Sequence, residues 1–443
     1  SINTGAGNDA VVVNSFASGA NTNAWAIRDS SIDVGSGDDF VSLNATTFQT
    51  QRRYDPAWGS ENSSIDLGSG NDRLFINANA SGQGDIRAFG ALDSTIDAGS
   101  GDDAISINAN ANTWGWNDPA TAKGLANSDV DLGSGNDFLS VNASTHGGDI
   151  SNATAVENSS IDAGSGDDGI FINANANTWG WYDPATAKGL ANSDVDLGSG
   201  NDFLSVRASS NGGISTATAV EDSSIDAGSG DNVVNINANA RANSNGGWWW
   251  NRGGNPATAK GLDNSDITTG AGDDKISINT NANSNGGWWW WNRGGNADSV
   301  GIDNNSSINT GAGNDAVVVN SFASGANTNA WAIRDSSIDV GSGDDFVSLN
   351  ATTFQTQRRY DPAWGSENSS IDLGSGNDRL FINANASGQG DIRAFGALDS
   401  TIDAGSGDDA ISINANANTW GWNDPATAKG LANSDVDLGS GND

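Results

Sequence analysis

The sequence predicts an all-β protein: a parallel β-solenoid (β-roll or β-helix) of about 31 residues per coil, roughly three-sided, with variable Trp-rich side arms. Three observations predict this fold. Residues 307–443 are identical to residues 1–137, an offset of 306 residues. Within that long period a Gly-rich turn returns every 30 to 42 residues. A stretch of alternating apolar and polar residues follows each turn, as expected for a half-buried strand.

The Gly-rich turn divides the chain into coils. It reads G-[S/A]-G-[N/D]-[D/N], and nine such turns fill one 306-residue period. We therefore interpret residues 1–443 as a single continuous solenoid and as a window of a longer repetitive chain. The predicted coils start near residues 1, 31, 64, 95, 129, 160, 194, 224, 266, 307, 337, 370, 401 and 435.

The coil over residues 95–128 shows the expected elements in order. A short strand over 95–98 enters the turn, a longer strand over 104–111 alternates strictly, and a third extended piece over 120–125 follows a variable segment. Side chains alternate between the two faces of a strand, so the apolar ones should point inward and the polar ones outward. The inward set is Ile96, Ala98, Ile105, Ile107, Ala109 and Ala111, and the outward set is Asp97, Ser106, Asn108 and Asn110. No helical period appears in the sequence.

The charge balance limits the classes of partner. The chain has 55 acidic against 19 basic residues and a net charge of −36. This argues against nucleic acid and anionic membrane surfaces, because both would repel the chain. No apolar run is long enough to predict a membrane span. The absence of Cys excludes disulfides and thiolate metal sites, and it suits an extracellular protein that is stabilised in another way.

Acidic residues recur at two positions around every turn. Parallel stacking places equivalent residues about 4.8 Å apart, so they should form two rows, in which unit charges repel by about 3–4 kcal/mol per neighbour at an effective dielectric constant of 20. The row at the end of the turn contains Asp9, Asp39, Asp72, Asp103, Asp137, Asp168, Asp202, Asp274, Asp315, Asp345, Asp378 and Asp409. The row before the turn contains Asp33, Asp66, Asp97, Asp131, Asp162, Asp196 and Asp226.

We expect a divalent cation, Ca²⁺, at this acidic corner. Carboxylates and the carbonyls of Gly turns are ligands that suit calcium, whereas nitrogen and sulfur ligands for zinc are missing. The alternative is a tight Gly turn with solvated acids at its edge. Asn232 replaces the Asp of the eighth coil, so a calcium site is doubtful there.

The turn resembles the calcium-binding nonapeptide G-G-x-G-x-D-x-U-x of RTX (hemolysin-type) proteins. Residues 98–106, AGSGDDAIS, align with it. The resemblance implies a calcium-loaded β-roll in which Asp103 gives its carboxylate and the Gly-rich turn its carbonyls. Two features depart from the family: Ala98 replaces the first Gly, and each coil has one motif where the usual roll has two. We therefore expect calcium along one corner and a wider, three-sided coil.

We expect all 17 Trp residues to lie in the variable segments, outside the core strands. There they either cap one flank of the solenoid or form a contact surface for another filament or for sugar rings. The expected contact residues are Trp114, Trp116, Trp179, Trp181, Trp248, Trp249, Trp250, Trp288, Trp289, Trp290 and Trp291. Outward Asn residues, such as Asn108 and Asn110, predict hydrogen-bonded ladders on a flat face, with recognition of ice or glycan as the alternative.

The sequence does not predict an enzyme. Catalysis needs a unique constellation of acid, base or nucleophile, whereas the acids here recur from coil to coil, and His146, the only histidine, is expected on a surface loop. We expect a secreted, extracellular or cell-surface structural protein, stabilised by calcium and self-associating into filaments or lateral bundles: a fibre, sheath, surface layer or adhesin stalk. The alternative function is a solenoid that binds glycan or ice through its Trp arms or Asn ladders.

Overall fold

The computed structural model describes residues 1–115, 118–179, 183–243, 255–285, 295–356, 359–421 and 423–443. These residues form parallel β-strands stacked as a solenoid and contain no helix, so the predicted fold class is confirmed. None of the described segments therefore has the long apolar helix that a membrane crossing would need. The chain divides into two compact units. Unit 1 contains residues 1–209 and 222–229, and unit 2 contains residues 210–221 and 230–443.

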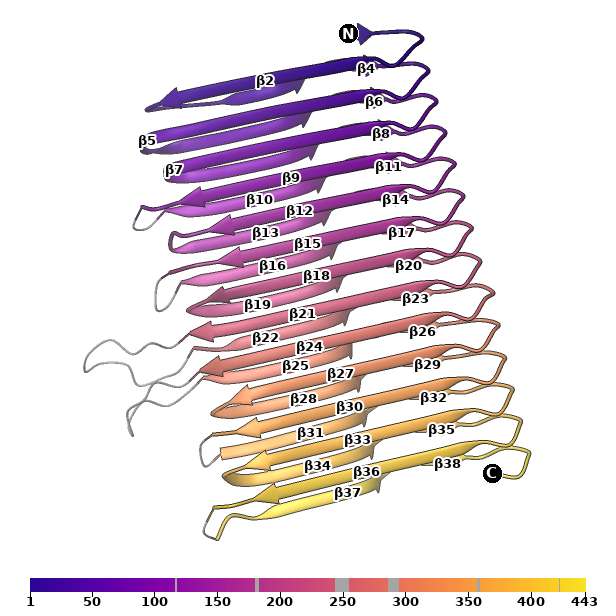
Figure 1. Cartoon of the computed structure of the whole chain (residues 1–443). Coiled ribbons are helices and arrows are strands. Elements are labelled where there is room, and N and C mark those ends of the chain that lie inside the picture. Colours follow the sequence, from indigo (N-terminus) through magenta and orange to yellow (C-terminus); the bar gives the residue numbers. More distant parts are fainter. Residues whose placement is uncertain (116–117, 180–182, 244–254, 286–294, 357–358, 422) are drawn as a thin grey trace, which may run out of the picture. The chain divides into compact units, whose positions relative to one another are not determined.

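One coil of unit 1 shows how the chain is wound (Figure 1). The short strand β8 (Thr95–Asp97) leads into the Gly-rich turn, and the long strand β9 (Ala104–Thr113) follows the turn. A second long strand, β10 (Pro119–Ala126), runs back toward the corner. Asn127 then adopts a left-handed backbone conformation with φ of 48°, and the next short strand, β11 (Asp129–Asp131), begins two residues later.

The other coils of unit 1 repeat these three positions. The short strands are β1 (Ile2–Asn3), β4 (Ser31–Asp33), β6 (Ser64–Asp66), β8, β11, β14 (Ser160–Asp162), β17 (Asp194–Asp196) and β20 (Ser224–Asp226). The first long strands are β2 (Ala10–Gly19), β5 (Phe40–Glu61), β7 (Arg73–Leu92), β9, β12 (Phe138–His146), β15 (Gly169–Asn177) and β18 (Phe203–Gly212). The second long strands are β3 (Ala24–Arg28), β10, β13 (Ile150–Glu157) and β16 (Pro184–Ala191), while β5 and β7 continue through this position without a break.

Unit 2 has the same three strand positions. Its short strands are β23 (Asp266–Thr268), β26 (Ser307–Asn309), β29 (Ser337–Asp339), β32 (Ser370–Asp372), β35 (Thr401–Asp403) and β38 (Asp435–Asp437). Its first long strands are β21 (Val233–Asn243), β24 (Lys275–Asn285), β27 (Ala316–Gly325), β30 (Phe346–Gln355), β33 (Arg379–Gly388) and β36 (Ala410–Thr419). Its second long strands are β19 (Ile214–Glu221), β22 (Ala257–Asp263), β25 (Asn296–Asp303), β28 (Asn327–Arg334), β31 (Arg359–Glu367), β34 (Gly390–Leu398) and β37 (Ala426–Ala432).

Equivalent strands of successive coils pair in parallel and in register. Ile107 of β9, for example, pairs with Ile76 of β7 on one side and with Val141 of β12 on the other. Apolar residues therefore lie above apolar residues, and polar residues lie above polar residues. This register converts the repeat of the sequence into rows of like side chains.

The predicted inward side chains form the core. Ile105, Ile107, Ala109 and Ala111 are 0% exposed, whereas the polar residues between them are only partly buried. The same alternation of buried and less buried residues runs along β33 in unit 2. Because neighbouring coils in register supply the covering side chains, the apolar side of one coil is buried mainly by stacking.

The expectation that every Trp lies outside the core strands is wrong for four of them. Trp25 in β3 and Trp58 in β5 stack with ring centroids 4.5 Å apart, and Phe89 of β7 continues the stack at 6.2 Å from Trp58. In unit 2, Trp331 and Trp364 stack at 4.4 Å in the same way. These rings occupy equivalent positions of the second long strands, so the parallel register places them directly above one another.

Candidate functional site

The candidate site starts from the backbone of the Gly-rich turn. In the turn after β8, Gly99 and Gly101 have φ of 86° and 127°, conformations that residues with a side chain rarely adopt. Between them, the N–H of Ser100 donates to the carbonyl of Gly68 at 3.0 Å, and the N–H of Gly101 donates to the carbonyl of Ser134 at 2.8 Å. The turns of neighbouring coils are thus hydrogen-bonded to one another, as the strands are.

The predicted row at the end of the turn lies inside the corner, and we call it the buried row. Asp103 and Asp137 are 2% and 3% exposed. The N–H of Asp72 donates to Oδ1 of Asp103 at 2.7 Å, and the N–H of Asp103 donates to Oδ1 of Asp137 at 2.7 Å. Each carboxylate therefore satisfies a backbone donor of the preceding coil. The same bond joins the consecutive row members from Asp9 to Asp202 in unit 1 and from Asp274 to Asp409 in unit 2.

The second oxygen of these carboxylates is buried without a hydrogen-bond partner. Burial of a carboxylate oxygen that accepts no hydrogen bond disfavours the ionised form. Burial accordingly raises the pKa of Asp103 to about 6 and the pKa of Asp137 to about 7, although the backbone N–H bond to each carboxylate opposes the rise. Among the described residues, Oδ2 lacks a partner in Asp9, Asp39, Asp72, Asp103, Asp137, Asp168, Asp274, Asp315, Asp345, Asp378 and Asp409.

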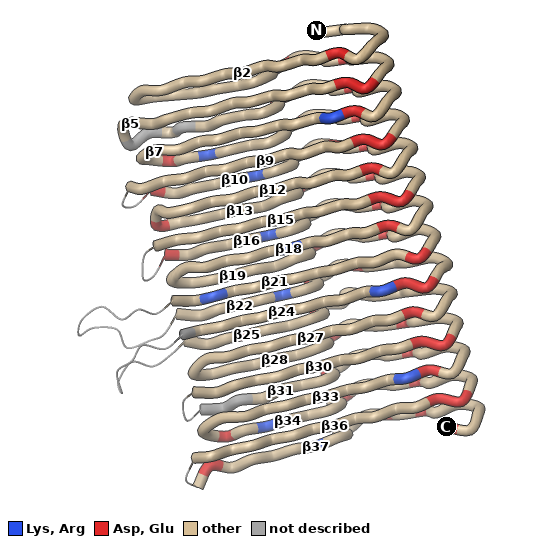
Figure 2. Tube along the Cα trace, in the orientation of Figure 1, with Lys and Arg blue, Asp and Glu red and all other residues tan. Residues whose placement is uncertain are grey.

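The predicted row before the turn has a different environment, and we call it the exposed row. Asp66, Asp97 and Asp131 pair in register on the short strands, with exposed side chains. Partial burial and then the charges of Asp131 and Asp66 raise the pKa of Asp97. Oδ1 of Asp196 and of Asp226 accepts the N–H of the Gly two residues further on, at 2.9 and 3.0 Å. Figure 2 shows the acidic residues of both rows gathered at the turn side of the coils.

The Asn and Asp residues that alternate along the turns in the sequence form a further ladder at the corner, and its hydrogen bonds were not predicted. The N–H of Asp102 donates to Oδ1 of Asn71 in the preceding coil at 2.8 Å, and the N–H of Asn136 donates to Oδ1 of Asp102 at 2.9 Å. This ladder runs in the direction opposite to that of the buried row. Because Asn and Asp alternate along it, Asp102 has neutral neighbours, which lowers the repulsion between charged side chains.

Asn232 shows that a neutral side chain fits the buried row. It is 1% exposed, and its N–H donates to Oδ1 of Asp274 at 2.8 Å, as the N–H of a row Asp does. Its Nδ2 donates to the carbonyl of Gly230 at 3.0 Å. A hydrogen-bond donor therefore finds a partner at the place where the Asp residues carry their second oxygen.

The donor atoms available to a cation at this corner are oxygens. Within the described ranges, no group of three or more His, Cys, Asp or Glu side chains is arranged to hold a metal ion. The buried row nevertheless supplies an unpartnered carboxylate oxygen in most coils. The carbonyls of Gly68 and Ser134 already accept backbone N–H groups. If a hard cation such as calcium bound at this corner, the unpartnered carboxylate oxygens of the buried row would be its main ligands.

The structure describes two of the predicted Trp contact residues. Trp114 is 44% exposed, and its ring lies 5.8 Å from the ring of Phe48. Trp179 is 61% exposed, and its Nε1 donates to Nε2 of His146 at 3.1 Å. His146 is exposed as expected, but it ends strand β12 instead of lying in a loop. Outside the described residues lie Trp116, Trp181, Trp248, Trp249, Trp250, Trp288, Trp289, Trp290 and Trp291.

The predicted Asn ladders are present on the outward face of the first long strands. Nδ2 of Asn108 donates to Oδ1 of Asn77 at 3.0 Å, and Nδ2 of Asn142 donates to Oδ1 of Asn108 at 3.1 Å. A second ladder lies two residues further along, where Nδ2 of Asn110 donates to Oδ1 of Asn79 at 3.0 Å.

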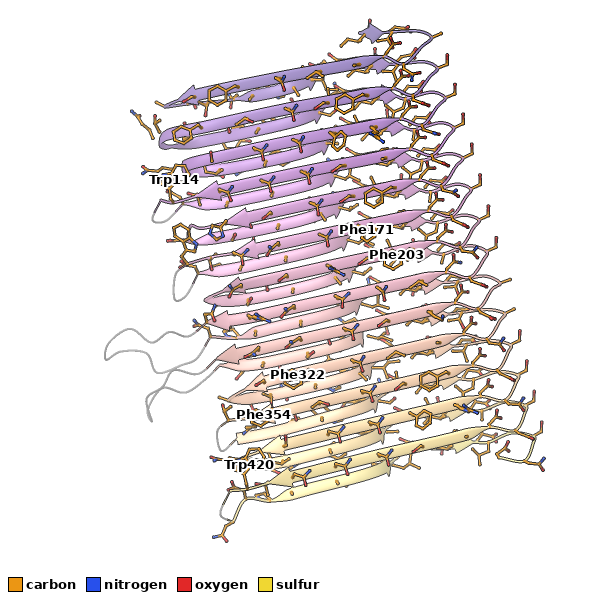
Figure 3. The ribbon with its side chains drawn as sticks, viewed as in Figure 1. Trp114, Phe171, Phe203, Phe322, Phe354 and Trp420 are labelled. Atoms are coloured by element: carbon orange, nitrogen blue, oxygen red, sulfur yellow. The ribbon has the colours of Figure 1, made fainter. Side chains whose placement is uncertain are left out.

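Phe residues at outward positions of the same face, exposed or half-buried, were missed by the sequence analysis. Phe138, Phe171 and Phe203 form a cluster in unit 1, with ring centroids 5.4 and 5.2 Å apart along the series. Phe322 of unit 2 is 37% exposed on the corresponding face (Figure 3). The signal that could have identified them is a large apolar residue at an outward position of a strictly alternating strand.

Fold and site together define a parallel β-solenoid whose corner is closed by side chains of neighbouring coils. No protein-family model matches the sequence, and neither a curated protein nor a solved structure matches it. The function must therefore be argued from the residues of this chain.

Proposed function

We propose that this chain is a secreted structural repeat protein of the cell exterior, without catalytic activity, in which calcium stabilises the acidic corner. It would build a fibre, sheath, surface layer or adhesin stalk by association into filaments or bundles. The observation that carries the proposal is the buried row, which repeats the same bond from coil to coil. A uniform ladder joins neighbouring coils, whereas a catalytic site needs a constellation that occurs once.

The unpartnered oxygens of the buried row support calcium as the stabilising ion. Oδ2 of Asp103 and Oδ2 of Asp137 are hard, anionic donors when ionised, and burial raises the pKa of both carboxyls because one backbone N–H bond to each does not offset the lost solvation. A divalent cation would supply that compensation. Extracellular calcium modules bind their ion with dissociation constants of about 10⁻⁴–10⁻³ M. Such an affinity would couple stabilisation to export, which supports an extracellular location.

Thermal unfolding of the full chain tests the calcium part of this proposal. Far-UV circular dichroism would be followed at neutral pH in EGTA, during titration with CaCl₂, and with MgCl₂ as the control for ionic strength and valence. We expect the melting temperature to rise near millimolar calcium and to rise less with magnesium, which keeps its water ligands more firmly. Identical melting curves in EGTA and in calcium would contradict a calcium-stabilised corner.

Two matched double variants, one in each acidic row, would show which row binds the proposed calcium ion. Asp103→Asn combined with Asp137→Asn removes two charges from the buried row, and Asp97→Asn combined with Asp131→Asn removes two from the exposed row. Hydrogen exchange read by mass spectrometry should show that only the first pair loses calcium-dependent protection in its own coils. Electron microscopy tests the structural part separately, because a chain that remains a single dispersed particle in calcium would contradict assembly into filaments or bundles.

A further inference from the structure

A groove lies on the outward face of the first long strands in unit 2. It has a volume of about 430 Å³ and is formed by β21, β24, β27 and β30. Two rows of outward side chains line it. One row contains Asn279 and Asn320, whose amides are hydrogen-bonded to each other at 2.9 Å. The other row contains Asn281 and Phe322, which pair in register on β24 and β27.

Phe322 interrupts an amide ladder. In unit 1 the corresponding row is continuous at Asn79 and Asn110, whose amides are bonded at 3.0 Å. In unit 2 the Phe ring takes the place of an amide next to Asn281. Oδ1 of Asn281 and Oδ1 of its neighbour Asn239 are buried and have no hydrogen-bond partner among the described residues. The groove therefore holds amide acceptors with unused capacity beside a 37% exposed aromatic ring.

The chemistry of the groove selects the class of ligand. Its lining consists of Asn, Ser, Thr, Ala and Phe and contains neither an acid nor a base. A charged ligand would find no counter-ion there, and a nucleic acid would also be repelled by the net charge of −36. A purely apolar ligand would leave the amides of Asn239 and Asn281 unsatisfied. A ligand that suits all of these features has an apolar flat side for Phe322 and hydroxyl donors at its edges.

A pyranose ring has this distribution of groups. Its C–H side packs on an aromatic ring, and its hydroxyls donate to and accept from amides. The terminal torsion of an Asn side chain is soft, so a small rotation can turn the unpartnered Oδ1 atoms of Asn281 and Asn239 toward a ligand. We propose that the groove around Phe322 binds a neutral oligosaccharide, with Phe322 as the stacking platform and these two amides as acceptors of sugar hydroxyl groups. The site does not depend on the proposed calcium at the corner.

Phe16 provides a sequence-matched control. It has the same flanking sequence as Phe322, since residues 1–137 and 307–443 are identical. Phe16 pairs with Thr46 of β5 as Phe322 pairs with Thr352 of β30. Phe16 is 72% exposed and does not line the groove. Substitution of Phe16 removes an equal ring from an equal sequence without touching the groove.

The test is isothermal titration of the full chain with three probes: a β-1,4-linked glucose hexamer, an α-1,4-linked glucose hexamer and, as the charged counterpart, a galacturonate hexamer. We expect a neutral hexamer to bind and the galacturonate hexamer not to bind. Phe322→Ala should weaken binding by about tenfold or more, as expected for the loss of one aromatic contact. Phe322→Tyr and Phe16→Ala should retain it. Circular dichroism would confirm that the variants fold, as expected for an exposed side chain.

Three results would overturn the proposal. The first is that neither neutral hexamer binds the unmodified chain at millimolar concentration. The second is that Phe322→Ala binds as well as the unmodified chain, which would place saccharide binding elsewhere. The third is that the galacturonate hexamer competes equally with a neutral one. None of these results would affect the proposed calcium-stabilised corner, because its test measures melting and hydrogen exchange without any saccharide.

Discussion

The turn corner and the outward face of the first long strands lie in the same coils but differ in how much their residues vary. At the corner, the buried row is Asp in every coil except at Asn232. On the outward face, residues that pair in register change from Asn110 to Ser144 in unit 1 and from Asn281 to Phe322 in unit 2. The repeat is therefore nearly invariant at the corner and variable on the face.

The difference reflects what each region must satisfy. At the corner, two glycines with positive φ and a buried carboxylate close the backbone, and each of them contacts the backbone of a neighbouring coil. On the face, the backbone is already paired by the strands, so the outward side chain contributes only ladder bonds or surface. Substitutions at the corner should therefore affect stability, whereas substitutions on the face should affect recognition.

The largest expected difference in stability is between substitutions of two glycines, one at the corner and one on the outward face. Gly101 at the corner has φ of 127°, and a Cβ there would lie 1.7 Å from the carbonyl oxygen of Gly70. Gly169 on the outward face has no positive φ, and its nearest neighbours to a Cβ are the rings of Phe138 and Phe171 at 3.7 Å. We expect Gly101→Ala to lower the free energy of unfolding by about 3 kcal/mol or more. Gly169→Ala should be neutral or stabilise by up to about 1 kcal/mol.

Hydrogen exchange of the full chain would compare the local stability of these two variants. A local measurement is needed because a repeat protein need not unfold in a single step. Gly101→Ala should accelerate exchange in its own coil and in the coils on either side, and Gly169→Ala should leave exchange unchanged. Equal protection from exchange in the two variants would mean that the corner tolerates an added side chain as well as the outward face does.

A smaller effect is expected within the buried row. Asp137→Ala leaves the N–H of Asp103 buried without its acceptor, which costs about 1–3 kcal/mol. Asp137→Asn keeps the acceptor oxygen and adds a donor, as Asn232 does where its Nδ2 reaches the carbonyl of Gly230. In EGTA at neutral pH we expect Asp137→Asn to be at least as stable as the unmodified chain and Asp137→Ala to be less stable, as measured by urea unfolding. The reverse order would show that the charge of Asp137 is itself required.

The same row predicts how stability depends on pH. Burial raises the pKa of Asp137 to about 7, above the 3.8 of an ordinary Asp such as that of the unfolded chain. The folded state therefore binds the proton of Asp137 more tightly than the unfolded chain does. The stability that this protonation contributes is complete below about pH 4 and is lost as the pH rises through about 7. In EGTA, the chain should melt at a lower temperature above neutral pH than in mild acid, and Asp137→Asn should reduce that difference.

Sequence reasoning succeeded where a period governs the structure. The alternation over residues 104–111 predicted the buried face of β9, and the recurrence of the turn predicted that Asp103 and Asp137 would stack. It did not predict that these carboxylates are buried, although Asp103 has the same parity as Ile105 and Ile107, because a charged side chain is rarely expected in a core. It also misplaced Trp58, because the extended piece that closes each coil varies too much in sequence for a strand to be recognised there.

The smallest change in stability is expected for a substitution in the exposed row, and this substitution should stabilise the chain instead of destabilising it. Asp66 and Asp131 flank Asp97 in register, and their charges contribute to its raised pKa. Asp97→Asn removes a like charge from the middle of the row without removing a buried acceptor, so it should stabilise the chain by no more than about 0.5 kcal/mol at neutral pH. Salt screens repulsion between exposed charges, so the gain should disappear at high salt concentration. If Asp97→Asn instead destabilised the chain as much as Asp137→Ala does, the two rows would share one structural role, and the distinction between buried and exposed carboxylates would fail.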